Sequence, residues 1–148
     1  MAGDKPAVIT GARVIVERYV AWGETDAAGH NHFAAAFRWL EEGEHALYRC
    51  LGFSAEFIDR VPRVHIDIDY KDRLYFGQLI EVELGVVAVG SSSCRFAMHV
   101  RRDGIEVIGA SYVVVHVAGT TEGGAPWPEV LRSALESDAV YRVSEKVE

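Results

Sequence analysis

Apolar and polar residues alternate along most of the second half of the chain. Val64, Ile66 and Ile68 each stand between polar neighbours, and a period of two is typical of a strand with one buried face. The pattern predicts strands over about residues 13–22, 64–69, 80–89, 93–101 and 106–117. Asp103 and Gly104 separate the last two strands, and this dipeptide favours a tight hairpin turn.

One segment, residues 33–51, has the period of a helix instead. Its apolar stripe consists of Phe33, Phe37, Leu40, Leu47 and Leu51. Glu44 interrupts the stripe, so its carboxylate is predicted to reach a pocket, with Glu42 as a neighbour. Gly43 is unfavourable inside a helix and indicates close packing or a bend, and Gly52 is a typical helix end.

Two shorter helices are also predicted. The first covers residues 54–61, begins at the capping residue Ser54 and stops before Pro62. The second covers residues 129–136, with Pro128 at its first helical position. A glycine-rich stretch, residues 118–125, precedes it and resembles a linker.

A strand, a long helix and four further strands predict an α+β fold. Strands joined by tight turns favour one antiparallel sheet, and a single helix cannot form its own core. The sheet should therefore wrap around helix 33–51. We expect one domain over residues 1–148, with its core at about 13–117 and a C-terminal tail, 118–148, that carries the short helix.

Composition narrows the functional classes. The 148 residues carry a net charge of −7, which disfavours a broad nucleic-acid interface because that needs a basic face. There is no apolar run long enough to span a membrane, and the N-terminus lacks the pattern of a secretory signal. Two cysteines, Cys50 and Cys94, are too few for a disulfide scaffold. A cytoplasmic protein is expected.

The polar loop between the first strand and the long helix is the first candidate site. Asp26 lies on this loop, seven residues before Phe33. The N-terminus of a helix stabilises negative charge, so an oxyanion formed from a carbonyl would be stabilised there. A nearby carboxylate could attack that carbonyl or activate water. Alternatively, Asp26 is a turn residue that binds its own backbone.

Other polar clusters are weaker candidates. His30 and His32 lack the partner ligands that a structural zinc site needs, so no metal is predicted and the lining of a polar pocket is the better interpretation. Ser91 and Ser92 stand in a polar turn without the sequence pattern of a hydrolase nucleophile.

Three blocks of the chain resemble the 4-hydroxybenzoyl-CoA thioesterase family of the hotdog fold. The first joins ETDAAG at 24–29 to FRWLEE at 37–42 with the family's spacing. The second runs from Asp67 to Ile80, and the third is the end of the last hairpin, 109–115. Together they lie within about residues 13–117.

The resemblance implies an acyl-CoA thioesterase that needs neither a metal nor a cofactor, coenzyme A being part of the substrate. Asp26 matches the family's catalytic carboxylate, and the backbone N–H of Phe33 matches its oxyanion donor. Gly29 matches the glycine that turns the loop toward the helix. The family forms a homodimer with a continuous sheet and active sites at the interface, and a dimer of dimers is expected.

Further residues are predicted to bind the substrate. His30 and His32 stand where relatives carry apolar or aromatic residues, so they should affect the choice of acyl group. Ser91 and Ser92 occupy the stretch where some relatives bind nucleotide phosphates with basic residues. Glu42 is also expected to bind the substrate, as a neighbour of Glu44 at the pocket. An acyl carrier protein remains an alternative donor, although the net charge of −7 disfavours docking of another acidic protein.

Two other functions stay open. A hotdog dehydratase or hydratase would use a histidine, which makes His30 or His32 the critical residue. A non-catalytic module would keep the acyl pocket without turnover.

Overall fold

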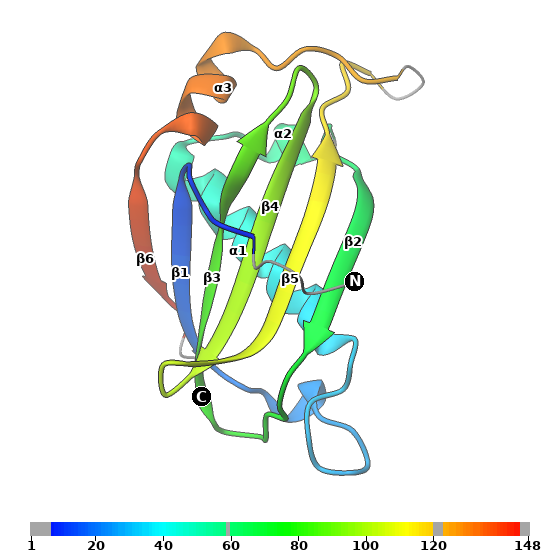
Figure 1. The fold of residues 1–148 in the computed structure, drawn as a ribbon, viewed down its shortest axis with the longest axis vertical. Coiled ribbons are helices and arrows are strands. Elements are labelled where there is room, and N and C mark those ends of the chain that lie inside the picture. The colour runs from blue at the N-terminus through cyan, green and yellow to red at the C-terminus, as the bar shows by residue number, and fades with distance from the viewer. Residues whose placement is uncertain (1–6, 59, 120–122, 146–148) are drawn as a thin grey trace.

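The computed structural model describes residues 7–58, 60–119 and 123–145, and Figure 1 shows its ribbon. In chain order its elements are β1 (Arg13–Tyr19), the 3-10 turn η1 (Trp22–Glu24), α1 (Ala35–Leu51), α2 (Ala55–Ile58), β2 (Arg63–Tyr70), β3 (Leu79–Val89), β4 (Ser93–Arg102), β5 (Ile105–Val115), α3 (Glu129–Glu136) and β6 (Val140–Ser144). The predicted long helix and the predicted strands are all present, with bounds that differ by a few residues.

The strands form one sheet in the order β2-β5-β4-β3-β1-β6. Each neighbouring pair is antiparallel except β1 and β6, which run parallel. Helix α1 lies along one face of this sheet, and the strands curve around it (Figure 1). The predicted α+β fold, a largely antiparallel sheet around one helix, is confirmed.

Helix α1 buries one face against β3 and β1. Trp39, Leu40 and Leu47 are almost completely buried. At Gly43 a Cβ atom would lie only 3.0 Å from the Cβ of Leu84 on β3. Close packing, one of the two explanations offered for this glycine, is therefore the reason for it, because a larger residue would push the helix away from the sheet.

The ends of α1 differ from the prediction in one respect. The helix ends at Gly52, whose φ of +83° is the left-handed conformation that glycine favours. Its start, however, is Ala35 rather than Phe33. Phe33 and Phe37 are 64% and 41% exposed, so their place in the buried stripe was predicted wrongly. Phe33 precedes the helix, and Phe37 lies in its first turn.

The C-terminal segment is more than the predicted tail. Helix α3 has the predicted bounds, but Pro128 is its N-cap and not its first helical residue. Strand β6 was not predicted, and it pairs along β1 from Arg13 to Glu17. β6 has five residues and pairs in parallel with the first strand of the chain. Because no tight turn joins two such strands, the sequence carries no hairpin motif that would predict the pairing.

The two ends of the sheet carry different connections. At one end lie the loop between β1 and α1 and the turn between β2 and β3; at the other lie the β3–β4 turn, α2 and α3 (Figure 1). The first two connections are joined by Asn31, which donates its N–H to the carbonyl of Leu74 at 2.7 Å and accepts the Leu74 N–H through Oδ1 at 2.8 Å.

Candidate active site

Asp26 sits in a tight turn that leaves part of its carboxylate without a partner. The turn is closed by hydrogen bonds from the Asp26 N–H to the carbonyl of His30 and from the Gly29 N–H to the carbonyl of Asp26, both 2.9 Å long. Oδ1 of Asp26 accepts the N–H of Ala28 at 2.8 Å. Within the described residues, no hydrogen bond reaches Oδ2. The turn role and the catalytic role are thus compatible, because each uses a different oxygen.

Gly29 gives the loop its direction. Its φ of +89° lies in the left-handed region, which costs a residue with a Cβ about 1 kcal/mol or more. The chain then reverses toward α1, and Thr25 and Asn31 face each other across the loop in an isolated β-bridge. This geometry holds Asp26 beside the start of the helix.

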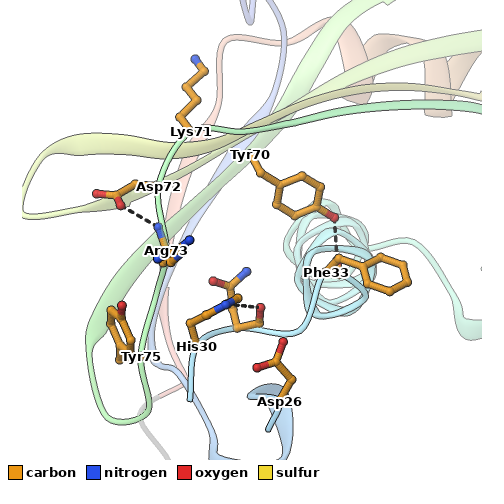
Figure 2. A pocket seen from close by; sticks show the side chains of 9 residues that line it. Asp26, His30, Phe33, Tyr70, Lys71, Asp72, Arg73 and Tyr75 are labelled. Carbon is orange, nitrogen blue, oxygen red and sulfur yellow. Dashed lines mark hydrogen bonds between the residues drawn. The ribbon is translucent and has the colours of Figure 1, made fainter. Parts of the chain in front are cut away.

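A cavity of about 560 Å³ opens next to Asp26. It lies between the loop that precedes α1, the end of β2 and the turn that follows β2 (Figure 2). The residues that line it are Asp26, His30, Asn31, Phe33, Tyr70, Lys71, Asp72, Arg73 and Tyr75. Aromatic rings and charged groups therefore share its walls.

Among the described residues that immediately precede α1, Phe33 is the one whose N–H has no acceptor. The N–H of His32 donates to the carbonyl of Glu24 at 2.8 Å, and that of Ala35 donates to the carbonyl of His32 at 2.9 Å. The N–H of Ala34 donates to Nδ1 of His32 at 3.1 Å. In the described part of the chain, the N–H of Phe33 has no such acceptor. A free backbone donor beside a carboxylate is what a developing oxyanion needs.

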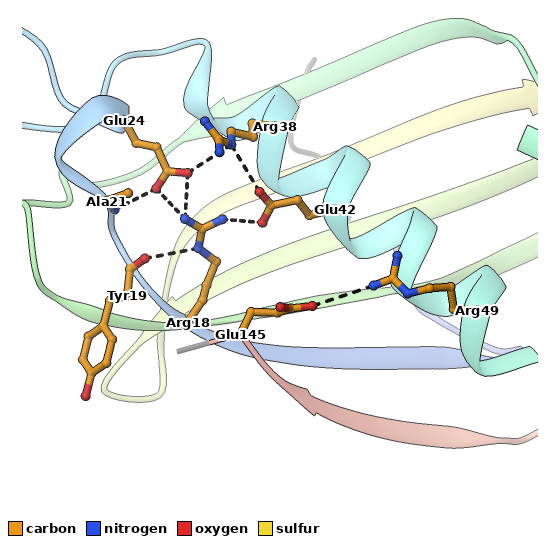
Figure 3. A network of polar contacts seen from close by, with 8 residues as sticks. All are labelled: Arg18, Tyr19, Ala21, Glu24, Arg38, Glu42, Arg49 and Glu145. Atoms are coloured by element: carbon orange, nitrogen blue, oxygen red, sulfur yellow. Dashed lines mark hydrogen bonds and ion pairs between the residues drawn. The ribbon is translucent and has the colours of Figure 1, made fainter. Parts of the chain in front are cut away.

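The loop is anchored to the rest of the protein by Glu24 and its ion pairs. Nη2 of Arg18 lies 2.7 Å from both carboxylate oxygens of Glu24, and Nη1 contacts Glu42 on α1. Arg38 also contacts Glu42, at 3.2 Å. Figure 3 shows the Arg18 guanidinium between the two glutamates. Because the Glu24 carbonyl accepts the His32 N–H, this network fixes the segment that presents Phe33.

The structure places the predicted site residues in four groups. Asp26, His30 and Phe33 line the cavity. Gly29 and His32 shape the loop before the helix, and Glu42 belongs to the ion network. Ser91 and Ser92 form the fourth group.

Ser91 and Ser92 lie at the opposite end of the sheet. Their carbonyls accept the N–H groups of Trp127 at 3.1 Å and His116 at 2.7 Å. They do not meet Asp26, and a substrate role for them stays a prediction.

Sequence reasoning missed the residues that β2 and the following turn contribute. Tyr70 donates its hydroxyl to the carbonyl of Phe33 at 2.5 Å, and burial raises the pKa of this phenol above its ordinary value. Arg73 lines the cavity and has no ion pair within the described residues. The alternation of β2 was informative, since Tyr70 shares a face with Ile66 and Ile68, the face that points toward α1.

The buried Glu44 does not reach the cavity. It is bound by Tyr48, Tyr112 and Arg63, so its predicted exposure to a pocket was wrong: the residue turns toward the sheet. In the described part of the chain, no group of three or more His, Cys, Asp or Glu side chains is arranged to hold a metal ion. None of the described helices is long and apolar enough to cross a membrane.

A largely antiparallel sheet wrapped around one long helix is the architecture of the hotdog-fold thioesterases. A family model for the thioesterase-like superfamily matches residues 20–135. The chain belongs to this superfamily and is a thioesterase, as the resemblance predicted.

Individual relatives agree with this assignment. The chain is 30% identical to a 1,4-dihydroxy-2-naphthoyl-CoA hydrolase of Synechococcus elongatus, over 83% of this chain and 95% of that protein. Two solved structures share the fold. A 1,4-dihydroxy-2-naphthoyl-CoA thioesterase from Synechocystis has a TM-score of 0.76 and 19% identity, covering 83% of this chain and 95% of that one. A thioesterase of Thermus thermophilus, solved with coenzyme A and zinc, has a TM-score of 0.74 and 21% identity over 83% and 97%.

Proposed function

We propose that the protein hydrolyses an acyl-CoA thioester in the cavity beside Asp26. The observation that carries this proposal is that the free Oδ2 of Asp26 and the free N–H of Phe33 belong to residues that line the same cavity. The N–H would stabilise the oxyanion formed when the thioester carbonyl is attacked. No metal and no cofactor are needed, since coenzyme A enters as part of the substrate.

Two routes use the same carboxylate. As a general base, Asp26 takes a proton from water, the water oxygen bonds to the carbonyl carbon, and the C–S bond breaks to release the thiolate. As a nucleophile, Asp26 itself bonds to the carbonyl carbon and expels the thiolate, and water then cleaves the resulting anhydride. Either route ends in a free acid and a protonated thiol.

An aromatic acyl group is the proposed substrate class. The Synechococcus elongatus relative, 30% identical, is named for a 1,4-dihydroxy-2-naphthoyl-CoA substrate. The rings of Phe33, Tyr70 and Tyr75 line the cavity here, and such rings favour edge and face contacts with an aromatic guest. The guanidinium of Arg73 would bind an anionic group of the substrate, such as a phosphate of coenzyme A.

A homodimer through β2 is part of the proposal, as is a dimer of such dimers. β2 ends the strand order, and Val64 on it is 60% exposed. An unpaired strand edge with exposed apolar side chains is suited to pairing with a second copy. The cavity borders the end of β2, so the partner would stand close to it. A cytoplasmic location, which suits a coenzyme A substrate, is proposed as well.

The dehydratase alternative finds less support. A catalytic histidine in that reaction must act on the substrate, yet Nδ1 of His32 accepts the N–H of Ala34. Nδ1 of His30 contacts the carbonyl of Asn31 at 3.2 Å. Neither ring is hydrogen-bonded to Asp26.

The test is release of free thiol from short, long and aromatic acyl-CoAs by the wild type and by Asp26→Asn. We expect turnover by the wild type and a loss of at least about 100-fold in the variant, because it lacks the catalytic base or nucleophile. Asp138→Asn, an exposed aspartate far from the cavity, is the matched control and should keep full activity.

Two outcomes would change the proposal. Retained activity in Asp26→Asn would remove Asp26 from the mechanism. Turnover of acyl carrier protein thioesters, with none of the coenzyme A thioesters, would replace the proposed donor.

A further inference from the structure

Tyr70 bridges two segments that are far apart in the sequence. It is the last residue of β2, and its hydroxyl donates to the Phe33 carbonyl, 37 positions away, at 2.5 Å. Figure 2 shows the ring reaching from the sheet to the start of α1, with the hydroxyl at the Phe33 carbonyl. The sheet is thereby connected to the residue that carries the proposed oxyanion donor.

Little else holds Phe33. Its side chain is 64% exposed and stacks on the ring of His32, which is itself exposed. The residue precedes Ala34, the N-cap of α1, so its carbonyl lies outside the helical hydrogen-bond ladder. Among the described residues, the Tyr70 hydroxyl makes the one hydrogen bond to the backbone of Phe33.

The chemistry of the bond fixes its direction. A carbonyl only accepts, so the phenol must be the donor and must be protonated. The side chain of Tyr70 is therefore fully used as a donor and is not available to transfer a proton to the substrate. Its effect on catalysis has to pass through the position of Phe33.

Position matters strongly at an oxyanion donor. Such a donor must lie about 2.7–3.1 Å from the place where the negative charge develops, and a displacement of about 1 Å can cost about 100-fold in rate. The neighbours of Phe33 are held by hydrogen bonds of their own, from the His32 N–H to Glu24 and from the Ala35 N–H to His32. The Phe33 peptide itself can therefore tilt when the Tyr70 bond is lost, while the loop and the helix on either side stay in place.

We propose that Tyr70 is a positioning residue for thioester hydrolysis, whose hydroxyl sets the orientation of the Phe33 backbone and so of its N–H toward the substrate. This role rests on the proposed function of Asp26 and Phe33. It predicts that the hydroxyl contributes to stabilisation of the transition state and not to binding of the substrate ground state.

The test compares Tyr70→Phe with the wild type in the full chain. The variant keeps the ring, so its melting temperature should stay close to that of the wild type. We expect kcat to fall about 10-fold, part of the 100-fold or more that loss of a whole oxyanion donor costs, with KM changed less than about twofold. Tyr19→Phe is the control, since Tyr19 is similarly exposed (36% against 44%) and lies outside the cavity.

A second readout separates positioning from a merely structural role. A trifluoromethyl ketone analogue of the acyl-CoA mimics the oxyanion, whereas a thioether analogue mimics the bound substrate. The variant should bind the ketone about 10-fold more weakly, in line with its loss of kcat, and should bind the thioether as the wild type does. Equal weakening of both analogues, or an unchanged kcat, would overturn the role of Tyr70.

The outcome is distinguishable from failure of the proposed function. If the wild type hydrolyses thioesters and Tyr70→Phe matches it, only the role of Tyr70 falls. If the wild type hydrolyses no thioester, the proposed function falls and takes the role of Tyr70 with it.

Discussion

Asp26 lies on the loop that precedes α1 and Glu44 lies in the middle of that helix, and the surroundings of these two carboxylates are opposite. Asp26 is half-buried beside a cavity, with one oxygen bound by the turn. Glu44 is 1% exposed, and both its oxygens are occupied. Tyr48 donates to Oε2 at 2.5 Å, while Oε1 accepts from Tyr112 at 2.8 Å and from Arg63 at 2.8 Å.

The difference shows which carboxylate is available for chemistry. A fully bound carboxylate in the core satisfies its neighbours and has no oxygen left for a substrate. The same contacts affect the phenols: burial, and then the charge of Glu44, raise the pKa values of Tyr48 and Tyr112 well above the ordinary value. They remain protonated donors, and the Glu44 cluster belongs to the structural part of the protein.

The largest effect on stability is expected from Glu44→Ala. The change leaves two phenols and the half-buried Arg63 without their acceptor, and loss of one partner of a buried pair costs about 3–5 kcal/mol. The free energy of unfolding in urea measures this loss. If Glu44→Ala does not fold, Glu44→Gln keeps the size of the side chain and should lose less. Stability equal to that of the wild type in both variants would show that the cluster is not structural.

A smaller loss of stability is expected from Arg18→Met, which removes the ion pairs of Arg18 with Glu24 and Glu42. Glu24 would stay buried with the Ala21 N–H at 2.8 Å and one cation, Arg38 at 3.5 Å. We expect a loss of about 2–3 kcal/mol, because Glu42 is partly exposed and less affected. The kcat should fall as well, because the backbone carbonyl of Glu24 accepts the His32 N–H and so helps to position the neighbouring Phe33.

Arg49→Met is the control for this prediction. Its guanidinium is exposed and lies 3.7 Å from Glu145, and such a pair contributes under about 1 kcal/mol. Equal losses in the two arginine variants would indicate that the Glu24 network does not anchor the loop.

The smallest effect on stability is expected at Glu106, whose carboxylate is partly buried and is bound by Lys71 and His99. Burial alone would raise its pKa, but hydrogen bonds from Lys71 and His99 outweigh burial and lower it. A lowered pKa in the folded state stabilises the fold above the unfolded pKa, about 4.3 for glutamate, and this contribution disappears as the pH falls through the folded pKa.

Glu106→Gln should therefore be less stable than the wild type at pH 7, by under about 1 kcal/mol, and the difference should vanish at low pH. Urea unfolding at both pH values measures it, with the exposed Glu56→Gln as the control. A difference that grows on acidification would contradict the sign of the pKa change.

The sequence predicted the parts of the fold that follow from local periodicity. The strands, α1 and its end at Gly52 all followed from spacing, because burial of one face imposes that spacing. β6 did not, since its partner is the first strand of the chain. Helix α1 starts two residues later than predicted, because the prediction took Phe33 as the first residue of the buried stripe and its side chain is exposed.

The position of Asp26 and Phe33 beside one cavity was predictable because the family motif supplied their spacing, while their catalytic roles stay a prediction. Tyr70 was not, because a hydrogen bond across 37 positions leaves no local pattern. Glu44 illustrates the opposite error: a charge on an apolar stripe indicated a pocket, and the tertiary structure supplied two buried tyrosines instead.

The most direct test of the comparison is the rate of thiol release by Asp26→Asn and Glu44→Gln, measured together at a temperature where both variants are folded. We expect Glu44→Gln to keep a rate within a few-fold of the wild type, while Asp26→Asn loses at least about 100-fold. The reverse order, with Glu44→Gln inactive and Asp26→Asn active, would place the catalytic carboxylate on the helix and remove Asp26 from the mechanism.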